Sequence, residues 1–563
     1  MEIREIKNPL FLKDLDQNEL KNVCNDIREF IIDYTSQNGG YLSGNLSAVE
    51  LSVMLNKVFS SDDVLIFDGN DLNYTNKILN GMVDKLQFNC NGAYSLANAL
   101  GLAASRDLEH KDYNVVCVVN SSDLLSGRNI ETLNLISNSG KRLIIVFNDD
   151  TTIDRGIGLI DRLISGLRTT KGYTNLKDNV KDLIRPAKKG DKIIENIHNF
   201  KTNIKKTMLD EGIFSEFNID YIGPIDGHDL NDLNRAFEIA KEKTYPAVVH
   251  CITTKGKGFR YAEASTSDAW NKVGKFDKEN GKMLASEKDN YLYAKNIVGM
   301  TMEKLMGIND DIVCVTSRNI NDYGVANIFA KYPQRCFDTV SSAENSLSFA
   351  SGLALDGKIP FITLRSFELL NAFKELNNQI NKLYRPMIIG FINDGNLNYD
   401  LLANLNNVYI YEPEDSKKLQ NALYTGISLD KPLIVIYPEK CIEFNEINDF
   451  SQINLGIWEK SANNDMNKVA VFASGTDLKQ IKEIIDSNEL PYDLINTASY
   501  SPMDEECLKE ILENHEHLFF YGHKLETKIL KYLNRNSCKA TVEFIDEEGI
   551  NTLFDRIKDK LNA

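Results

Sequence analysis

Short apolar runs recur along this chain of 563 residues, and they constrain its fold more than any other feature of the sequence. Each run has five to seven residues and is rich in Val and Ile. Continuous apolar runs of this length are typical of strands that are buried on both faces of a sheet. They lie at residues 114–119, 143–148, 247–253, 312–316, 386–392, 432–437 and 470–474.

Stretches with helical spacing of apolar residues lie between these runs. Residues 415–425 and 477–486 are two examples, in which apolar residues recur every three or four positions. Alternation of buried strands with amphipathic helices predicts an α/β protein with mainly parallel sheets.

The length predicts three to four domains at about 150 residues each. Polar stretches at residues 272–289 and 446–463 interrupt the alternating pattern and indicate domain boundaries. We therefore predict three domains, at residues 1–280, 281–445 and 446–563. The first is predicted to carry a polar, lysine-rich helical insertion at about residues 155–215.

Composition excludes several kinds of partner. The net charge of −17 argues against an extended nucleic-acid interface, which needs clustered Lys and Arg. No apolar run approaches the ~18 residues that would span a bilayer. The first twenty residues carry mixed charges without an apolar segment, so we expect a cytoplasmic protein. The nine cysteines form no CxxC pair, which favours reduced thiols over zinc sites or disulfides.

Several short sequence words occur in an order that resembles one enzyme family. They are GGYLSGNLSAVEL at residues 39–51, NDD at 148–150, YIGPIDGHD at 221–229, TTKGKGFRYAE at 253–263, VGKFD at 273–277 and FDTVSSAENSLSFASGLAL at 337–355. In order and spacing, the chain resembles 1-deoxy-D-xylulose-5-phosphate synthase, a thiamine-diphosphate enzyme of the transketolase superfamily.

The resemblance implies a transketolase-like fold with a diphosphate-binding domain, a pyrimidine-binding domain and a C-terminal domain. The family condenses pyruvate, after decarboxylation, with glyceraldehyde 3-phosphate in isoprenoid precursor synthesis. It requires thiamine diphosphate and Mg²⁺ and works as a homodimer. These properties become expectations for the present chain only where its residues match those of the family.

The metal and cofactor positions that the resemblance assigns differ from the family pattern. Ser121 stands where the family has a metal-binding aspartate, and Asp150 stands where it has a metal-binding asparagine. Asp123 lies two residues further on, so a shifted acidic metal site with Asp150 stays open. The cofactor-binding positions that the resemblance assigns are Cys90, Asn91, Gly92, Ser122, Asp123, Lys255 and Phe259.

The groups that move protons in the family are also replaced. Thiamine needs a carboxylic acid against its aminopyrimidine ring, and the resemblance puts Ala343 at that position. Glu344 is one residue away, and only a local bulge would let it substitute. The family histidines correspond to Tyr41, Asp71, Asn91 and Asn271, so no family catalytic residue is intact.

The substrate-phosphate positions have reversed their charge. Bidentate arginine suits a sugar phosphate. The resemblance puts Asp394 and Glu439 at the positions of two family arginines. We therefore expect that a phosphosugar does not bind here in the family's manner.

Three interpretations follow. The one we favour is a synthase-like protein that has lost its catalytic residues and acts as a binding, regulatory or partner subunit. Such a protein would form a homodimer or pair with an authentic synthase chain, and it would bind no cofactor. The second is an enzyme with altered chemistry in the inherited cleft. The third is an active synthase that uses thiamine diphosphate and Mg²⁺. None of the three involves nucleic acid or a membrane.

Overall fold

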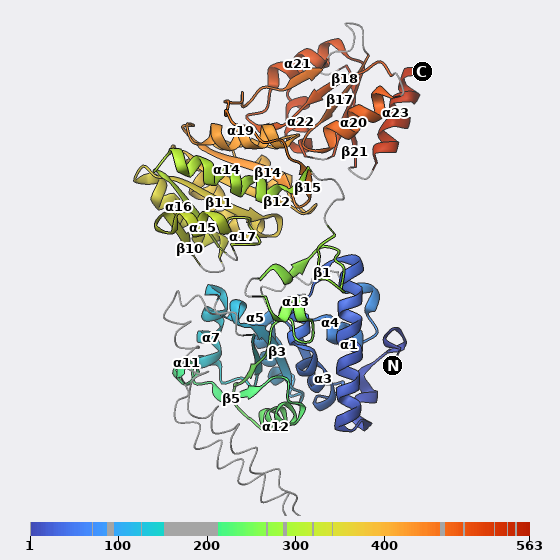
Figure 1. Ribbon diagram of the computed structural model, residues 1–563, viewed down its shortest axis with the longest axis vertical. Helices are drawn as coiled ribbons and strands as arrows, with labels where there is room; N and C mark the ends of the chain where they lie inside the picture. The colour runs from blue at the N-terminus through green and yellow to red at the C-terminus, as the bar shows by residue number, and fades with distance from the viewer. Residues whose placement is uncertain are drawn as a thin grey trace, which may run out of the picture. The chain divides into compact units, whose positions relative to one another are not determined.

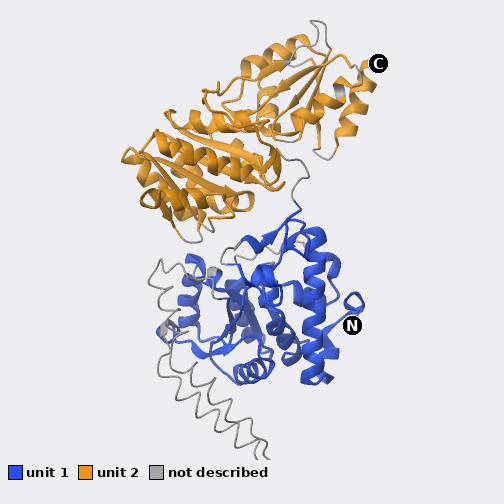
Figure 2. Cartoon of the chain, viewed as in Figure 1, with its two compact units in different colours: residues 1–285 blue, residues 286–563 orange. Residues whose placement is uncertain are grey.

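The computed structural model divides the chain into two compact units, unit 1 at residues 1–285 and unit 2 at residues 286–563 (Figures 1 and 2). It describes residues 2–562, except for residues 70, 87–94, 125, 151–211, 266–267, 285–289, 318–319, 340–341, 462–467, 488–489, 523, 537–538 and 547–548. Within these limits, no helix is both long enough and apolar enough to span a membrane.

Unit 1 is built on a five-stranded parallel sheet with the order β2-β3-β4-β6-β5. Its strands are β2 (Val64–Phe67), β3 (Val115–Asn120), β4 (Ile144–Asp149), β5 (Asp220–Asp226) and β6 (Ala247–Ile252). Every residue of β3 and β4 is buried, because helices cover both faces of the sheet.

The two faces of this sheet have separate apolar cores. Val116 of β3 packs into one core together with α1, α3 and α12, whereas Cys117 packs into the other together with α5 and α7. The longer helices are α1 (Gln17–Asn38), α3 (Val49–Val58), α5 (Ser95–Leu108), α7 (Gly127–Ser139) and α12 (Leu230–Lys241). Alternate residues of one strand thus enter different cores, which explains why the strand is apolar throughout.

Short elements complete unit 1. β1 (Gly40–Tyr41) pairs antiparallel with β7 (Lys272–Val273), which joins the beginning of the unit to its end. The short helices are α2 (Ser43–Ser47), α4 (Tyr74–Leu79), α6 (Ser121–Leu124), α11 (Gly212–Glu216) and α13 (Arg260–Glu263).

Unit 2 contains a seven-stranded sheet with the order β10-β9-β11-β12-β14-β13-β19, parallel except for β19. Its strands are β9 (Ile312–Thr316), β10 (Cys336–Asp338), β11 (Ile359–Arg365), β12 (Met387–Asn393), β13 (Tyr409–Tyr411), β14 (Pro432–Pro438) and β19 (Ser499–Ser501). The surrounding helices are α14 (Ala294–Ile308), α15 (Ala326–Lys331), α16 (Ala343–Leu355), α17 (Leu369–Asn378), α18 (Tyr399–Ala403) and α19 (Ser416–Gly426).

A second sheet of unit 2 has five strands in the order β16-β18-β17-β20-β21, and only β16 runs antiparallel to its neighbour. The strands are β16 (Glu459–Ser461), β17 (Val469–Ala473), β18 (Asp493–Asn496), β20 (His517–Tyr521) and β21 (Thr541–Ile545). The helices are α20 (Asp477–Asp486), α21 (Glu505–Asn514), α22 (Glu526–Leu533) and α23 (Ile550–Asn562). β8 (Tyr291–Tyr293) and β15 (Cys441–Glu443) form a separate two-stranded antiparallel sheet.

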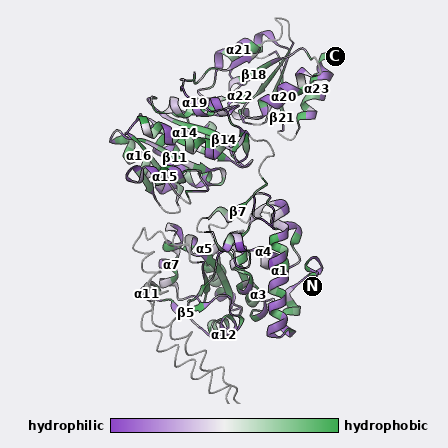
Figure 3. Ribbon diagram, viewed as in Figure 1, coloured by the Kyte–Doolittle hydropathy of each residue, from purple (hydrophilic) through white to green (hydrophobic). Residues whose placement is uncertain are grey.

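The predicted fold class, α/β with mainly parallel sheets, is confirmed. Hydrophobic colour marks the strands, whereas helices such as α1 and α23 carry both colours (Figure 3). The described cysteines are free, with Cys24, Cys117, Cys251 and Cys314 buried. The division into three domains stays a prediction. The predicted helical insertion falls almost entirely within residues 151–211, outside the described residues.

Candidate functional site

Polar residues gather at one edge of the unit 1 sheet, where its parallel strands end. Asp68 follows β2, Asn120 ends β3, Asp150 follows β4 and Thr253 follows β6. The carboxyl ends of parallel strands form the usual ligand crevice of an open α/β sheet. This edge is therefore the first candidate site.

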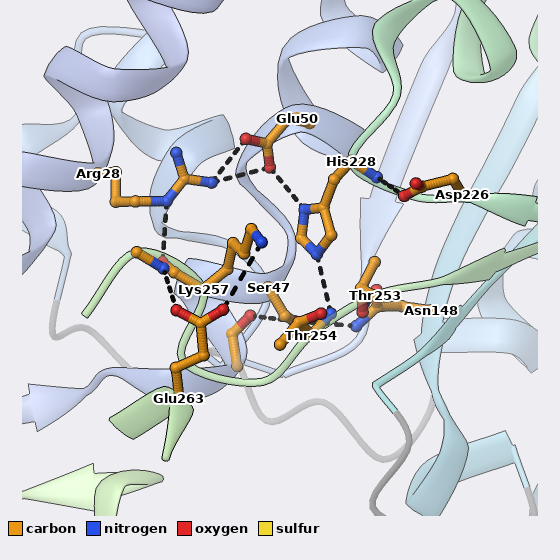
Figure 4. Close-up of polar contacts among 12 residues, drawn as sticks. Arg28, Ser47, Glu50, Asn148, Asp226, His228, Thr253, Thr254, Lys257 and Glu263 are labelled. Carbon is orange, nitrogen blue, oxygen red and sulfur yellow. Dashed lines mark hydrogen bonds and ion pairs between the residues drawn. The ribbon is translucent and has the colours of Figure 1, made fainter. Parts of the chain in front are cut away.

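Amide and hydroxyl groups link the strand ends through hydrogen bonds inside unit 1. Asn120 Nδ2 donates to Asp71 Oδ2 at 2.6 Å, and Asn148 Nδ2 donates to Asn120 Oδ1 at 3.0 Å. Thr253 Oγ1 donates to Asn148 Oδ1 at 2.9 Å, a contact drawn in Figure 4. Asn148 is completely buried. These side chains therefore bond to one another and hold the ends of β3, β4 and β6 together.

Ser121 takes part in a second buried network. Its Oγ donates to Asp149 Oδ1 at 3.2 Å, and His250 Nε2 lies 2.8 Å from Asp149 Oδ2. The other ring nitrogen of His250, Nδ1, lies 2.7 Å from the hydroxyl of Tyr221. Burial and the Asp149 carboxylate raise the pKa of Tyr221 well above its usual value, so this phenol stays protonated. The Ser121 hydroxyl is thus bound within the protein.

Four aspartates lie near the carboxyl ends of the unit 1 strands, namely Asp68, Asp71, Asp123 and Asp150. We call these four residues the acidic edge. Burial, followed by the charges of Asp123 and Asp71, raises the pKa of Asp68 to about 8. Burial, Asp123 and Asp150 similarly raise the pKa of Asp71 to about 7, although Lys255 opposes the shift. Burial and the neighbouring carboxylates thus make it costly to charge Asp68 and Asp71.

Asp68 is the most enclosed member of the acidic edge, with 1% of its surface exposed. Its Oδ1 accepts a hydrogen bond from Ser95 Oγ at 3.0 Å, and its Oδ2 has no hydrogen-bond partner among the described residues. In the part of the chain that the structure describes, no three His, Cys, Asp or Glu side chains are arranged to hold a metal ion. Among the described residues, the acidic edge is therefore a cluster of carboxylates that raise one another's pKa.

A second set of polar residues in unit 1 is centred on Glu50 and includes Arg28, His228 and the backbone of Thr254 and Lys257 (Figure 4). We call it the Glu50 network. Arg28 Nη2 donates to both oxygens of Glu50, at 2.7 and 2.8 Å. His228 Nδ1 lies 3.0 Å from Glu50 Oε2, and His228 Nε2 accepts a hydrogen bond from the Thr254 backbone N–H at 2.8 Å. Because Nε2 is an acceptor, the proton is on Nδ1, which donates to Glu50.

The Glu50 network positions the loop that follows β6. Arg28 Nε donates to the Lys257 carbonyl oxygen at 2.9 Å. Gly258 has a φ of +82°, and a Cβ at this position would lie 2.3 Å from Arg28 Cδ. Glycine is thus required at 258 both for its backbone conformation and for the close approach of Arg28. Within unit 1, the network connects α1, α3 and the turn after β5 with this loop.

The beginning of α16 is the relevant part of the seven-stranded sheet in unit 2. Ser342 caps the helix by accepting a hydrogen bond from the Asn345 backbone N–H at 3.2 Å. Ala343 is 4% exposed and packs in the apolar core. The Glu344 side chain accepts a hydrogen bond from Ser342 Oγ at 2.8 Å. Ala343 and Glu344 thus have different surroundings: Ala343 packs in the core, whereas Glu344 hydrogen-bonds to the capping residue Ser342.

A pocket of about 320 Å³ lies inside unit 2, where strands of both sheets end. Asp394, after β12, and Glu439, after β14, line it together with Glu412, Asp477 and Lys524. We call it the unit 2 pocket. Its residues come from positions 393–524 and meet because the carboxyl ends of β12, β13, β14, β17 and β20 converge.

The chain is similar to known proteins along most of its length. The N-terminal family model of 1-deoxy-D-xylulose-5-phosphate synthase matches residues 3–92 and 84–253. The 1-deoxy-D-xylulose-5-phosphate synthase of Caldanaerobacter subterraneus is 29% identical over 554 residues, covering 90% of this chain and 87% of the relative. That of Alkaliphilus oremlandii is 29% identical over 609 residues, covering 99% and 96%.

The chain is thus similar, over most of its length, to 1-deoxy-D-xylulose-5-phosphate synthases. Among solved structures, the transketolase of Campylobacter jejuni covers 96% of this chain and 98% of its own length, with 13% identity and a TM-score of 0.39.

Two of the positions assigned to synthase-family histidines lie close together. Tyr41 of β1 is the register partner of Lys272 in β7, so it lies next to Asn271 along this pairing. Asn271 Oδ1 accepts a hydrogen bond from Ser43 Oγ at 2.6 Å. The third, Asp71, belongs to the acidic edge. Instead of an imidazole, these positions have a phenol, an amide and a carboxylate.

The residues at the cofactor positions that the resemblance assigns differ in their burial and in their contacts. Lys255 is half-buried and lies near enough to Asp71 to lower its pKa. Phe259 is buried in an aromatic cluster, with its ring centroid 5.1 Å from that of Trp270 and 5.5 Å from that of Phe276. Cys90, Asn91 and Gly92 lie outside the described residues, as does the side chain of Ser122.

The sequence patterns did not predict several residues that the structure places in these sites. Asp68 directly follows an apolar run, VLIF, and this position is itself a signal for the edge of a sheet. Glu412, Lys524 and Arg365 are single charged residues without any motif. The Arg28 contact to Glu50 was also missed, although Glu50 and His228 lie within the family words.

Proposed function

We propose that this chain is a synthase-family protein that no longer condenses pyruvate with glyceraldehyde 3-phosphate and serves as a binding, regulatory or partner subunit. The proposal places it in the cytoplasm, as a homodimer or paired with an authentic synthase chain. The acidic edge is the observation that carries this proposal.

The acidic edge does not fit a magnesium-bound diphosphate. Such a group needs oxygen ligands in near-octahedral array around the metal, and backbone that approaches the phosphates. Ser121, at the position of a family metal ligand, instead donates to Asp149. Without a metal, a diphosphate beside the carboxylates that raise the pKa of Asp68 to about 8 would add further repulsion.

The surroundings of Ala343 support the same conclusion for proton transfer. A buried methyl group stands where the family needs a carboxylic acid. Glu344, the nearest alternative, is bonded to Ser342 at the beginning of the helix. Without an acid against the aminopyrimidine ring, the family cofactor would lack the proton relay that activates it.

The substrate-phosphate positions support it as well. Asp394 and Glu439 both line the unit 2 pocket. Two carboxylates at positions that would face a phosphate oppose its binding instead of promoting it. The loss thus involves the metal, the acid and the substrate contacts together, and no single substitution explains it.

The proposal is tested by the reaction itself. Purified protein is mixed with pyruvate, glyceraldehyde 3-phosphate, thiamine diphosphate and Mg²⁺, and released CO₂ is measured. The Caldanaerobacter synthase serves as positive control. We expect no CO₂ above the protein-free reaction, whereas turnover within a few-fold of that synthase would overturn the proposal.

The partner role has its own test. The tagged chain is co-expressed with an authentic synthase, purified through its tag, and analysed for the second chain in apparent 1:1 stoichiometry. Stable co-purification would favour a partner subunit. A purely homodimeric protein would favour a binding or regulatory role.

A further inference from the structure

A buried ion pair forms part of the lining of the unit 2 pocket. Glu412 and Lys524 form an ion pair there, with Lys524 Nζ 3.2 Å from each oxygen of Glu412. Both side chains are more than nine-tenths buried, at 9% and 8% exposure. Ser474 Oγ donates to Glu412 Oε2 at 3.2 Å, and the Tyr500 hydroxyl donates to the same oxygen.

A glycine lets the Glu412 carboxylate reach this position. Gly475 has a φ of +66°, and a Cβ there would lie 2.8 Å from Glu412 Oε1. Any other residue would push the carboxylate away from the pocket or strain the loop after β17. This part of the lining is therefore built from a charged pair with defined geometry, which is typical of a binding site.

The charges of the pocket are unbalanced towards negative. Four of its lining residues are carboxylates, namely Asp394, Glu412, Glu439 and Asp477. Lys440 and Lys524 also line it, and Arg365 pairs with Glu439 at 2.5 Å. Among the described residues, the four carboxylates of the pocket and these three basic side chains thus sum to a charge of −1.

Asp394 and Asp477 are the two carboxylates of the pocket that make no ion pair shorter than 4.0 Å with a described residue. Asp394 makes no ion pair with any described residue, and its Oδ1 accepts only local hydrogen bonds from Asn396. Asp477 lies 4.0 Å from Lys524, whose shorter contacts go to Glu412. Both aspartates are half-buried, so their charges are only partly screened by solvent.

We propose that the unit 2 pocket binds a small hydrophilic ligand through an ammonium group, with Asp394 and Asp477 as its acceptors. An ammonium offers three N–H donors and one positive charge, which matches two carboxylates with free acceptor capacity. An anionic ligand meets net repulsion at the same place. The inference rests on the proposed loss of phosphate binding, and it names the ligand class that replaces the phosphate.

The proposal is tested by calorimetric titration of the full chain with 1,4-diaminobutane. We expect saturable binding, and no binding of 1,4-butanediol, which has hydroxyls in place of the ammonium groups. D394N and D477N should each weaken the affinity at least tenfold. D356N, which removes an exposed carboxylate at the end of α16, should leave the affinity unchanged.

Three results would overturn the proposal. Equal binding of the diamine to D394N, D477N and the unmodified chain would show only general attraction to a protein of net charge −17. No binding of the diamine would exclude the ligand class, while the absence of CO₂ release would still stand. Saturable binding of inorganic phosphate, titrated in parallel, would overturn both this inference and the loss of phosphate binding on which it rests.

Discussion

Glu50 and Asp68 are both largely buried carboxylates of unit 1, but their surroundings differ. Glu50 accepts two hydrogen bonds from Arg28 and one from His228. Burial acts to raise the pKa of Glu50, but His228 and Arg28 outweigh it and hold the pKa below its usual value. Ser95 Oγ donates a hydrogen bond to Asp68, but burial and the charges of Asp123 and Asp71 raise the pKa of Asp68 to about 8.

The difference separates the part of unit 1 that supports the fold from the part where the family performs chemistry. The Glu50 network joins segments that lie far apart in the sequence, and its charges are balanced. The acidic edge contains three of the positions that the resemblance assigns to the site, Asp71, Asp123 and Asp150, and its carboxylates raise one another's pKa. This contrast agrees with our proposal that the chain keeps the scaffold of its relatives without their cofactor site.

Removing the charge of Glu50 should have the largest effect. E50Q leaves the Arg28 guanidinium, 9% exposed, without its carboxylate. We expect a loss of about 3–5 kcal/mol in the free energy of unfolding, measured by urea denaturation. E29Q, at an exposed position of α1, is the matched control and should change stability little. Equal stability of the two variants would remove the contrast between the network and the acidic edge.

Asp68 should lower the free energy of unfolding as the pH rises, which is the reverse of the usual effect of a carboxylate. Its folded-state pKa of about 8 exceeds its unfolded value, so the cost of its charge is absent below about pH 4 and grows as the pH rises to 8. D68N should therefore be more stable than the unmodified protein at pH 9, by about 1–3 kcal/mol, with a smaller gain at pH 6. Equal urea midpoints at both pH values would show that this carboxylate is not destabilised.

Loss of His228 should have a smaller and local effect. H228A removes the acceptor of the Thr254 backbone N–H and one donor to Glu50. We expect a loss of about 1–2 kcal/mol in stability. Hydrogen exchange at the Thr254 amide should become faster, whereas H517A, in unit 2, should leave this amide protected. Unchanged protection in H228A would mean that the network does not hold the loop.

Restoring the metal ligand should have the smallest effect. S121D returns a carboxylate to the family position, but it also places another negative charge beside Asp149 and the acidic edge. We expect no measurable thiamine diphosphate binding in the presence of Mg²⁺, assayed by thermal shift. Micromolar binding in this single variant would show that the metal ligand alone was missing.

The strands of the cores could be predicted because burial on both faces makes them apolar throughout. The predicted run at 312–316 coincides with β9, Ile312–Thr316, and the run at 432–437 lies within β14, Pro432–Pro438. β11, Ile359–Arg365, was missed because Pro360 and the terminal Arg365 interrupt the apolar pattern. Pairing with β9 and β12 accommodates both residues, and the sequence does not reveal that pairing.

The candidate sites were predictable only where a motif or a strand end marked them. Ser121, Asp123 and Asp150 follow apolar runs, and the structure places Ser121 and Asp123 in α6, directly after β3, and Asp150 directly after β4. Lys524 and Glu412 are separated by 112 positions, so no local spacing indicates that they form a pair. Such contacts depend on how the sheets of unit 2 pack, which single-sequence patterns do not encode.

Calorimetric titration of the purified protein with thiamine diphosphate and Mg²⁺ tests the central claim most directly. If the acidic edge has replaced the diphosphate site, the titration will give no heat beyond dilution and the cofactor will not shift the melting temperature. Micromolar or tighter binding would contradict the account, because it would require a functional cofactor site despite Ser121, Ala343 and the carboxylates of the acidic edge.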